Sequence, residues 1–438
     1  MTDLTNPRAT VAALLEDVHA LMNNMQTAAA KLQHWLNATA AAPAATVVVP
    51  VVAAPVPAPV VVAPAKRGRK PKEKHPVLEA LTRMAKGWAG RAELVDTVVL
   101  LTPTHICTLP NAKIYWDYPC NTGLTSGRAA VSGRELLDAM KRAGVNAQLT
   151  ASADSQSLQV EGDVAVRLRA QGGFTADTWD EQAAALQHRP PTKVLAHGVW
   201  SRATYEAAVA ASSVCSKDAT RPTLTNVLFD KEGYVVATDG HRLDVRPIHH
   251  DGESLLVPAS VMPVLATCES SVFWEVSDTH IRLIDADGVA FTFPRSTEQF
   301  PNWRHVMPRK DNTETFAISV DREALLLRTK VKPNGLPHWH CHLIDNELQV
   351  EEHGVDGATK FTIPVSVLER PDGDRCLPRF GLNYTYVRDM CEGSNSRYIT
   401  LFVEDQLAPI LCTPGTAVSY EHAVSLNEPV HLIMPVRI

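Results

Sequence analysis

The sequence predicts an α+β fold made of three tandem copies of one unit. Three segments that each begin a short helix are evenly spaced, because Val131, Val257 and Asn383 follow one another at intervals of 126 residues. Two β-rich runs follow each of these helices, and a further helix with its own strands precedes each of them. A repeat of this length is a whole domain rather than a solenoid unit. At 438 residues the chain is long enough for two to four hydrophobic cores.

The chain is expected to divide into six segments. Three non-repeating segments come first, namely a helix, a linker and a basic run, and the three copies follow. Their expected bounds are 1–38, 39–65, 66–75, 76–191, 192–308 and 309–438.

Residues 7–38 are predicted to form an amphipathic helix, with Asn6 as its cap and Pro7 at the first helical position. Apolar side chains occupy successive a and d positions of a heptad for about four repeats. These are Val11, Leu14, Val18, Leu21, Met25, Ala28, Leu32 and Trp35. Such a stripe needs a partner, and three remain open: the body of the chain, a second copy of the chain or another protein.

Residues 39–65 contain only Ala, Val and Pro apart from two threonines, and the six prolines preclude a continuous helix. This linker could reach about 80 Å at ~3.1 Å per residue. The basic run then contains Arg67, Gly68, Arg69 and Lys70. It resembles an AT-hook, which lays an Arg-Gly-Arg core into the DNA minor groove. Lys70 interrupts the usual Gly-Arg-Pro, and a plain solvated basic run is the alternative.

Composition bounds the class of protein. Hydrophobic residues make up 45% of the chain and charged residues 21%, and no proline-free apolar run reaches the roughly 18 residues that span a membrane. The N-terminal residues lack a secretory signal, so a cytoplasmic protein is expected. None of the eight cysteines belongs to a C-x-x-C pair. Buried free thiols are therefore expected rather than disulfides or a zinc ribbon.

The net charge of −6 hides an asymmetry between the two parts of the chain. Residues 66–74 carry six basic side chains and one acidic one, and residues 1–74 together carry +4. The remaining residues, 75–438, therefore carry −10. Such an acidic body argues against tight gripping of DNA over its surface, but it allows a protein that surrounds DNA loosely.

The most informative stretch is Arg221–Val245, with the core ATDGHRL at Ala237–Leu243. It predicts a strand at Thr223–Phe229, a turn, a second strand at Tyr234–Thr238 and an Asp-Gly turn. Considered alone, this is a hairpin that happens to contain a histidine. Together with the C-terminal Ile433–Ile438, the stretch resembles the bacterial DNA polymerase III β subunit, the β sliding clamp. The resemblance covers roughly 76–438, and it is strongest in the second copy and the tail.

This resemblance implies three DNA-clamp domains per chain, with sheets outside and two helices inside each domain. Two chains would close head to tail into a homodimer ring around double-stranded DNA. A sliding clamp is a replication processivity factor that performs no catalysis and needs no cofactor. Basic side chains would face the DNA without reading its sequence. The helix candidates are Arg83, Lys86, Lys141, Arg142, Arg202, Arg322, Arg328, Lys330 and Arg388, and the resemblance adds the loop residues Arg91 and Arg221.

The resemblance also implies a peptide pocket between the second and third copies. It would hold short Q-L-x-L-F-type segments of the replicative polymerase, the clamp loader and repair proteins on an apolar floor with a polar rim. The implied residues are Leu224, Thr238, Gly240, His241, Arg242, Leu243, Pro301, His305, Val306, Tyr386, Pro409, Leu432, Met434, Pro435 and Val436. One departure matters, because His305 stands where the family commonly has an arginine. Partner preference is therefore expected to differ.

Two other functions remain open. His338, His340 and His342 share one face of a predicted strand, a spacing that can bind zinc, so a zinc-dependent hydrolase is the enzyme alternative. A specialised clamp paralogue, which recruits one partner through its N-terminal extension, is the binding alternative. No P-loop, G-x-S-x-G or G-x-G-x-x-G motif is present. Nucleotide hydrolysis and α/β-hydrolase chemistry therefore lack support.

Overall fold

The structure is a computed structural model, and the described part of the chain belongs to one compact unit, residues 71–438. The expected heptad helix, linker and basic run lie outside the described residues, as does Arg91. The expected domain boundaries at 191 and 308 fall within or beside undescribed residues and stay predictions. The described residues are 75–88, 97–108, 114–125, 127–170, 193–308, 315–330, 335–344, 346–354, 357–370, 379–415 and 419–437.

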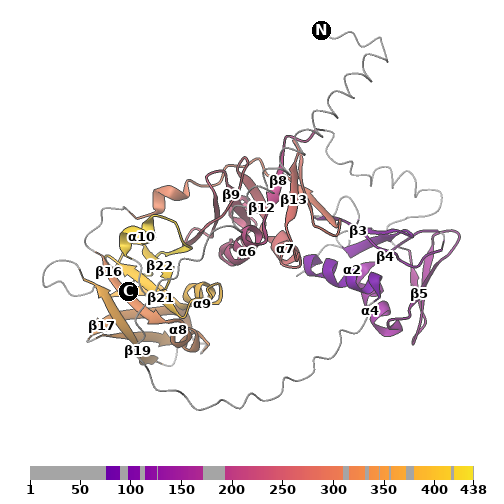
Figure 1. The fold of residues 1–438 in the computed structure, drawn as a ribbon. Coiled ribbons are helices and arrows are strands. Elements are labelled where there is room, and N and C mark those ends of the chain that lie inside the picture. Colours follow the sequence, from indigo (N-terminus) through magenta and orange to yellow (C-terminus); the bar gives the residue numbers. More distant parts are fainter. Residues whose placement is uncertain are drawn as a thin grey trace, which may run out of the picture. The chain divides into compact units, whose positions relative to one another are not determined.

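The first copy contains two helices and two groups of strands (Figure 1). Its first helix has Pro76 at its first position and the His75 ring as its cap. Its second helix is capped by the Ser132 hydroxyl and ends at Gly144, whose φ of +82° favours glycine. The elements are α2 (Pro76–Met84), a 3-10 turn (Ala85–Trp88), β1 (Val98–Leu101), β2 (His105–Thr108), β3 (Tyr115–Pro119), β4 (Ala129–Ser132), α4 (Gly133–Ala143), β5 (Gln148–Ala151), β6 (Ser157–Glu161) and β7 (Val166–Arg169).

The second copy repeats this order and adds a strand, β8, before its first helix. Ser201 caps its first helix through its side-chain hydroxyl. The elements are β8 (Ala196–Trp200), α6 (Arg202–Ala211), 3-10 turns at Ser212–Val214 and Pro222–Thr225, β9 (Asn226–Asp230), β10 (Tyr234–Thr238), β11 (Arg242–Pro247), β12 (Leu255–Pro258), a 3-10 turn (Ala259–Val261), α7 (Met262–Leu265), β13 (Val272–Val276), β14 (His280–Ile284), β15 (Ala290–Pro294) and a 3-10 turn (Trp303–Val306).

The third copy has the longest strands and carries the C-terminal tail. Asp321 and Asn383 cap its two main helices through their side-chain oxygens. The elements are β16 (Phe316–Asp321), α8 (Arg322–Thr329), β17 (Gly335–Ile344), β18 (Glu347–Gly354), β19 (Gly357–Glu369), β20 (Phe380–Asn383), α9 (Tyr384–Glu392), β21 (Tyr398–Val403), β22 (Ile410–Pro414), α10 (Tyr420–Val424) and β23 (Val430–Ile433).

Strand pairing joins neighbouring copies into continuous antiparallel sheets. An eight-stranded sheet runs β4-β1-β2-β3-β15-β14-β13-β8, so β15 of the second copy pairs with β3 of the first. A twelve-stranded sheet runs β12-β9-β10-β11-β23-β22-β21-β16-β19-β18-β17-β20, so β11 pairs with β23. The third sheet is β5-β6-β7. Each boundary between copies is therefore crossed by backbone hydrogen bonds.

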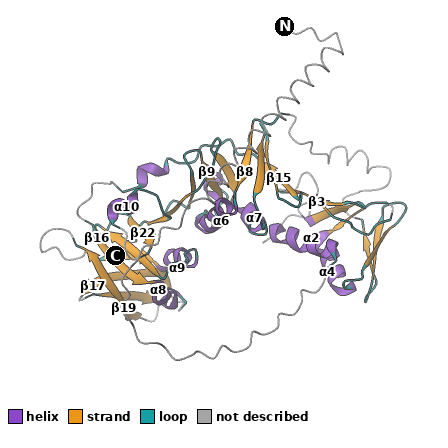
Figure 2. Cartoon of the chain, in the orientation of Figure 1, coloured by secondary structure: helices purple, strands orange, loops and turns teal. Residues whose placement is uncertain are grey.

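The helices pack in pairs, α2 with α4, α6 with α7 and α8 with α9 (Figure 2). One hydrophobic cluster extends through the first two copies, and a second fills the third copy. A third cluster, which includes Leu243, Phe300, Trp303 and Leu432, lies where the second and third copies meet. The α+β class, with two helices in each copy, is confirmed.

The expected strand at Thr223–Phe229 is wrong in its first half. Residues Pro222–Thr225 form a 3-10 turn, and the strand β9 begins at Asn226. Pro222 sits at the first position of the turn, and its carbonyl accepts hydrogen bonds from the Thr225 hydroxyl at 2.7 Å and the Asn226 side-chain amide at 2.7 Å. Local hydrogen bonds therefore override the strand propensity of the threonines.

Two further expectations concern the whole described part. Its cysteines are free, and burial raises the pKa of the Cys215 thiol to about 12. No described helix is both long enough and apolar enough to cross a membrane.

Candidate functional site

The strongest candidate site is the junction of β11 with β23 and the C-terminal tail. The two strands pair with Leu243 opposite Leu432 and Arg242 opposite Ile433. Past the end of β23, the Met434 amide donates a hydrogen bond to the His241 carbonyl at 2.9 Å. The Val436 amide then donates to the Gly381 carbonyl at 3.1 Å. The tail therefore runs from the second copy to β20 of the third copy.

The loop between β10 and β11 is held by its own side chains. The Asp239 carboxylate accepts hydrogen bonds from the amides of His241 at 2.9 Å and Arg242 at 3.1 Å. The Thr238 hydroxyl accepts from the Gly240 amide at 3.0 Å and donates to the Arg242 carbonyl at 2.7 Å. Gly240 has a φ of +91°, a conformation that favours glycine. The Thr-Asp-Gly sequence therefore fixes this loop, and His241 is exposed on it.

Arg242 joins the second copy to α9 of the third. Its guanidinium pairs with Asp239 at 2.9 Å and with Asp389 at 2.7 Å. It also donates to the Ser213 carbonyl at 3.1 Å and lies 4.5 Å from the centre of the Tyr386 ring. Because only 11% of the Arg242 side chain is exposed, it acts as an inter-copy tie rather than as a free cation at the rim.

The apolar residues of the predicted set divide into a floor and a rim. Leu243 and Leu432 are 4% and 3% exposed and belong to the cluster between the copies. Met434 is 39% exposed and Val306 is 50% exposed. Pro409 precedes Ile410, which pairs with Ile433, so the register continues with Pro409 beside Met434. Buried floor and exposed rim are what a docked peptide side chain requires.

The remaining predicted residues take no part in the hydrogen bonds of the loop or of Arg242. Leu224 is half-buried in the 3-10 turn Pro222–Thr225, where its carbonyl accepts from the Ser216 amide at 2.9 Å. Pro301 is exposed and lines a separate hollow beside β9. The exposed His305 ring lies 3.1 Å from the side-chain nitrogen of Asn302. Pro435 and Val436 are half-buried along the tail.

Sequence reasoning missed three residues at the junction. Asp389 and the Ser213 carbonyl anchor Arg242, and Leu407 is 58% exposed in the loop that leads to Pro409. Asp389 follows Arg388 on a predicted helix and gave no signal, because its partner lies 147 positions away. Leu407 gave no signal either, because the sequence alone does not show that this leucine is exposed.

Two of the predicted DNA-facing residues are wrong, because they are structural. The Arg83 guanidinium pairs with Asp285 of the second copy, and the two side chains are 11% and 4% exposed. It also donates to the Thr267 hydroxyl at 2.6 Å. The Arg322 guanidinium donates to the carbonyls of Cys391 at 3.0 Å and Ser394 at 2.9 Å, next to the end of α9. Neither cation is available to a phosphate.

The remaining basic candidates are exposed, apart from Arg388, which is half-buried and pairs with Asp389 at 3.1 Å. Acidic side chains on the same helices nearly balance them. The exposed basic residues on or next to these helices are Lys86, Arg134, Lys141, Arg142, Arg202, Arg328 and Lys330, and the exposed acidic ones are Glu79, Glu135, Asp138, Glu206, Glu323 and Glu392. Arg221 is also available, with 54% of its side chain exposed and Asp218 at 3.9 Å. Any contact of the described helices with DNA is therefore weak.

The histidines of β17 do not form a metal centre. His338, His340 and His342 share one face of the strand, and the His340 ring lies 4.7 Å from the ring of His353. Across the described ranges, no group of three or more His, Cys, Asp or Glu side chains is arranged to hold a metal ion. The zinc-hydrolase alternative therefore has no ligand set in this part of the chain.

Comparison with known proteins defines the fold. No protein-family model and no curated protein matches the sequence. Solved structures do match, and the fold they share with this chain is that of the bacterial DNA sliding clamps.

Three of these structures illustrate the similarity. The sliding clamp of Bartonella birtlesii, solved bound to griselimycin, matches with a TM-score of 0.66 and 16% identity, over 82% of this chain and 97% of that one. The DNA polymerase III β subunit of Thermotoga maritima matches with a TM-score of 0.66 and 16% identity, over 83% and 97%. The sliding clamp of Pseudomonas aeruginosa matches with a TM-score of 0.63 and 17% identity, over 82% and 98%.

Proposed function

We propose that this protein is a DNA sliding clamp that encircles duplex DNA in the cytoplasm and tethers a replicative polymerase and other partners. The observation that carries the proposal is the clamp fold over 82% of the chain, combined with the β11–β23 junction built by ATDGHRL and the tail. A clamp acts by topology and binding, so the proposal needs no catalytic residue and no cofactor.

Strand edges support ring closure by two chains. Sheets already continue across copies through β15–β3 and β11–β23. In the described part, β7 ends its sheet, and residues 357–364 of β19 pair with β18 on one side only. Pairing of β7 with residues 357–364 of β19 in a second chain would continue the sheets across the boundary between chains, as they already continue across copies. Two such pairings would close a head-to-tail homodimer.

Retention on DNA tests the ring. A ring loaded on nicked circular DNA should stay bound after a high-salt wash and should leave once the circle is cut, because the link is topological. Sedimentation velocity should show a dimer at micromolar concentration. A protein that is monomeric at all concentrations, or that leaves circular and linear DNA equally fast, would contradict the ring.

The peptide pocket is proposed at the junction, with Leu243 and Leu432 as floor and Met434, Leu407 and Val306 as exposed apolar rim. Burying one Leu or Phe anchor contributes roughly 1.5–3 kcal/mol. Two such anchors, offset by the ordering of the peptide, give micromolar binding that partners can exchange. His305 at the rim would change which partners are preferred.

Fluorescence anisotropy of a labelled Q-L-x-L-F peptide tests the pocket. Saturable binding is expected for the full chain and should be lost when Met434–Ile438 are removed. Met434→Ala should weaken binding about tenfold, because one apolar contact is lost. Val164→Ala, at an exposed site of the first copy (46% exposed), is the control and should bind normally. Equal binding by the full chain and the truncation would refute the location.

DNA contacts are proposed for Arg221, Arg91 and the basic run with Arg67, Arg69 and Lys70. The near balance of charge on the described helices supports this assignment, because phosphate attraction then depends on the loops and the basic run. Removing residues 66–74 should flatten the dependence of DNA binding on salt. An unchanged salt slope would contradict a role for the basic run.

A specialised paralogue is the second candidate. The matched clamps align over 97–98% of their own length, but only 82–83% of this chain is covered, so about a sixth of it has no counterpart in them. A core processivity factor should keep most of its activity in a primed-template extension assay after residues 1–75 are deleted. A specialised paralogue should lose its activity.

A further inference from the structure

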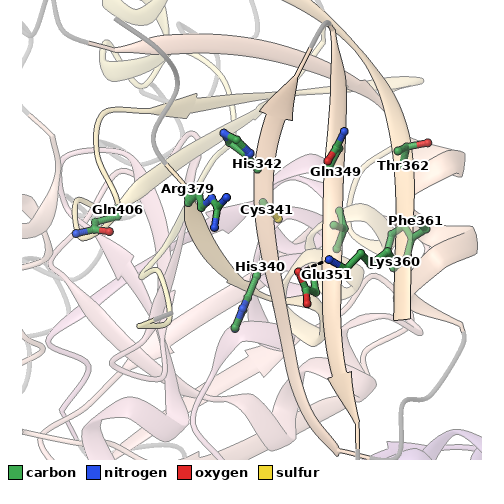
Figure 3. A pocket seen from close by; sticks show the side chains of 11 residues that line it. His340, Cys341, His342, Gln349, Glu351, Lys360, Phe361, Thr362, Arg379 and Gln406 are labelled. Atoms are coloured by element: carbon green, nitrogen blue, oxygen red, sulfur yellow. Dashed lines mark ion pairs between the residues drawn. The ribbon is translucent and has the colours of Figure 1, made fainter. Parts of the chain in front are cut away.

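A polar hollow of ≈ 670 Å³ lies on the solvent face of the sheet in the third copy. Its walls come from β17, β18, β19, the residue before β20 and the loop that follows β21. Figure 3 shows the side chains that line it, among them His340, His342, Glu351, Lys360, Arg379 and Gln406. We call this feature the sheet hollow.

Strand register explains why the hollow exists. His340 of β17 pairs with Glu351 of β18, which pairs with Lys360 of β19, so these three side chains form a row across the sheet. On the other side of His340 the register places Gly381. Because glycine has no side chain, the row contributes no side chain at β20.

The charge of the hollow is positive. Lys360 pairs with Glu351 at 3.2 Å, and that carboxylate is the one acidic group in the lining. Arg379 is exposed and has no carboxylate partner within the described ranges. With neutral histidines the lining therefore carries a net charge of +1. The other polar side chains of the lining include Gln349, Thr362 and Gln406, which carry no charge.

Residues of the hollow are chain neighbours of residues at the proposed peptide pocket. Gly381 accepts the hydrogen bond from the Val436 amide, so the tail runs along the edge of β20 next to the hollow. Gln406 lines the hollow, and its neighbour Leu407 is part of the exposed rim of the pocket. A chain that leaves the pocket past the tail would reach Arg379 within a few residues.

We propose that the sheet hollow is a second docking subsite, which binds the acidic flank of a peptide segment whose apolar part occupies the pocket at the β11–β23 junction. This inference rests on the proposed function. An acidic peptide fits better than single-stranded nucleic acid, because the lining has no Tyr or Trp and its one Phe, Phe361, packs against the Arg328 guanidinium at 5.0 Å and the Trp339 ring at 5.6 Å rather than standing free to stack on a base. The subsite adds specificity and a faster on-rate through electrostatic complementarity.

Four labelled peptides test the proposal against the full-length protein by anisotropy at low salt. One is the Q-L-x-L-F core alone, two carry four aspartates before or after the core, and one carries four serines. We expect one of the two acidic peptides to bind about five- to tenfold tighter than the core. Salt should reduce this gain, and the serine peptide should bind like the core.

Variants then assign the gain to the hollow. Arg379→Gln combined with Lys360→Gln should abolish the gain of the acidic peptide and leave the affinity for the core peptide unchanged; because Lys360 lies in the segment of β19 proposed to pair with β7, sedimentation velocity must give the same oligomeric state for this variant as for the wild type. Lys231→Gln, which removes an exposed charge from the turn after β9, is the matched control and should keep the gain.

The outcomes separate the two proposals. Binding of the core with no gain from either acidic flank, or a gain that survives in the double variant, overturns the sheet hollow and leaves the pocket standing. A core peptide that does not bind at all overturns the pocket and the hollow together. A gain for a labelled oligonucleotide that the double variant loses, with none for the acidic peptides, would reassign the hollow to nucleic acid.

Discussion

Replacing Arg242 with alanine should loosen the junction between the second and third copies. The Arg242 guanidinium pairs with two carboxylates, at 2.9 Å to Asp239 and 2.7 Å to Asp389, and is 11% exposed. The two carboxylate side chains are themselves only 16% and 21% exposed. Arg242→Ala therefore leaves Asp239 with little access to water and without its cation, while Asp389 keeps only the half-buried Arg388 at 3.1 Å.

The expected magnitude follows from this burial. Breaking a buried ion pair by removing one partner costs about 3–5 kcal/mol, whereas exposed pairs contribute ~0–1 kcal/mol. Because Asp389 keeps some exposure, we expect a loss near the lower end, about 3 kcal/mol. Asp389→Asn should cost less, since Arg242 keeps Asp239. The double-mutant cycle between Arg242 and Asp389 should give a coupling energy of about 1–3 kcal/mol.

Urea unfolding followed by circular dichroism measures these losses, provided that a second probe gives the same transition. Arg202→Ala is the matched control, because Arg202 pairs with Glu206 at the same 2.7 Å but the two side chains are 62% and 54% exposed. That variant should unfold like the wild type. If Arg242→Ala and Arg202→Ala lowered the free energy of unfolding by the same small amount, the burial of the Arg242 ion pairs would not contribute to stability as argued.

Two further predictions concern buried charges between the copies. Arg83→Ala should lower the free energy of unfolding by about 3–5 kcal/mol, because Asp285 is left buried without its cation. The control Lys86→Ala should leave the melting temperature unchanged. Equal melting temperatures for the two variants would refute the structural role of Arg83. Burial lowers the pKa of His431, although its ring nitrogen lies 3.3 Å from Asp244, so the folded protein resists a proton that the unfolded chain accepts. Stability is then fully present above the ordinary pKa of 6.5 and falls as the pH drops below it. His431→Gln should reduce this slope in unfolding experiments between about pH 7.5 and 5.5, and an unchanged slope would refute the assignment.

Much of the fold could be predicted from local sequence. The 126-residue spacing located the helices that follow Val131, Val257 and Asn383, and the strand at Tyr234–Thr238 was predicted with its observed bounds. These features depend on neighbours a few positions away. The 3-10 turn that begins at Pro222 was missed, because threonine and leucine there have strand propensity while the hydrogen bonds to the Pro222 carbonyl decide the conformation.

The candidate site was harder to predict, since its polar contacts join distant positions. Nothing near Arg83 in sequence indicates burial, because Asp285 belongs to the next copy. A single sequence does not distinguish an exposed basic residue on a helix from one that is buried in an ion pair. The family resemblance supplied the pocket residues, but it gave no account of how Asp389 and Ser213 hold Arg242 in place.

On the proposed function, the junction also explains how a clamp fold shared at 16% identity can accommodate different partners. Leu243 and Leu432 lie opposite each other on paired strands, so changing either one disturbs the sheet that joins the copies. Met434, Leu407 and His305 are exposed, and substitutions there alter the rim at little cost in folding free energy. Partner preference should therefore diverge at the rim, whereas the floor is constrained by stability. His305, which by the family resemblance stands in the place of an arginine, is a replacement of this permitted kind.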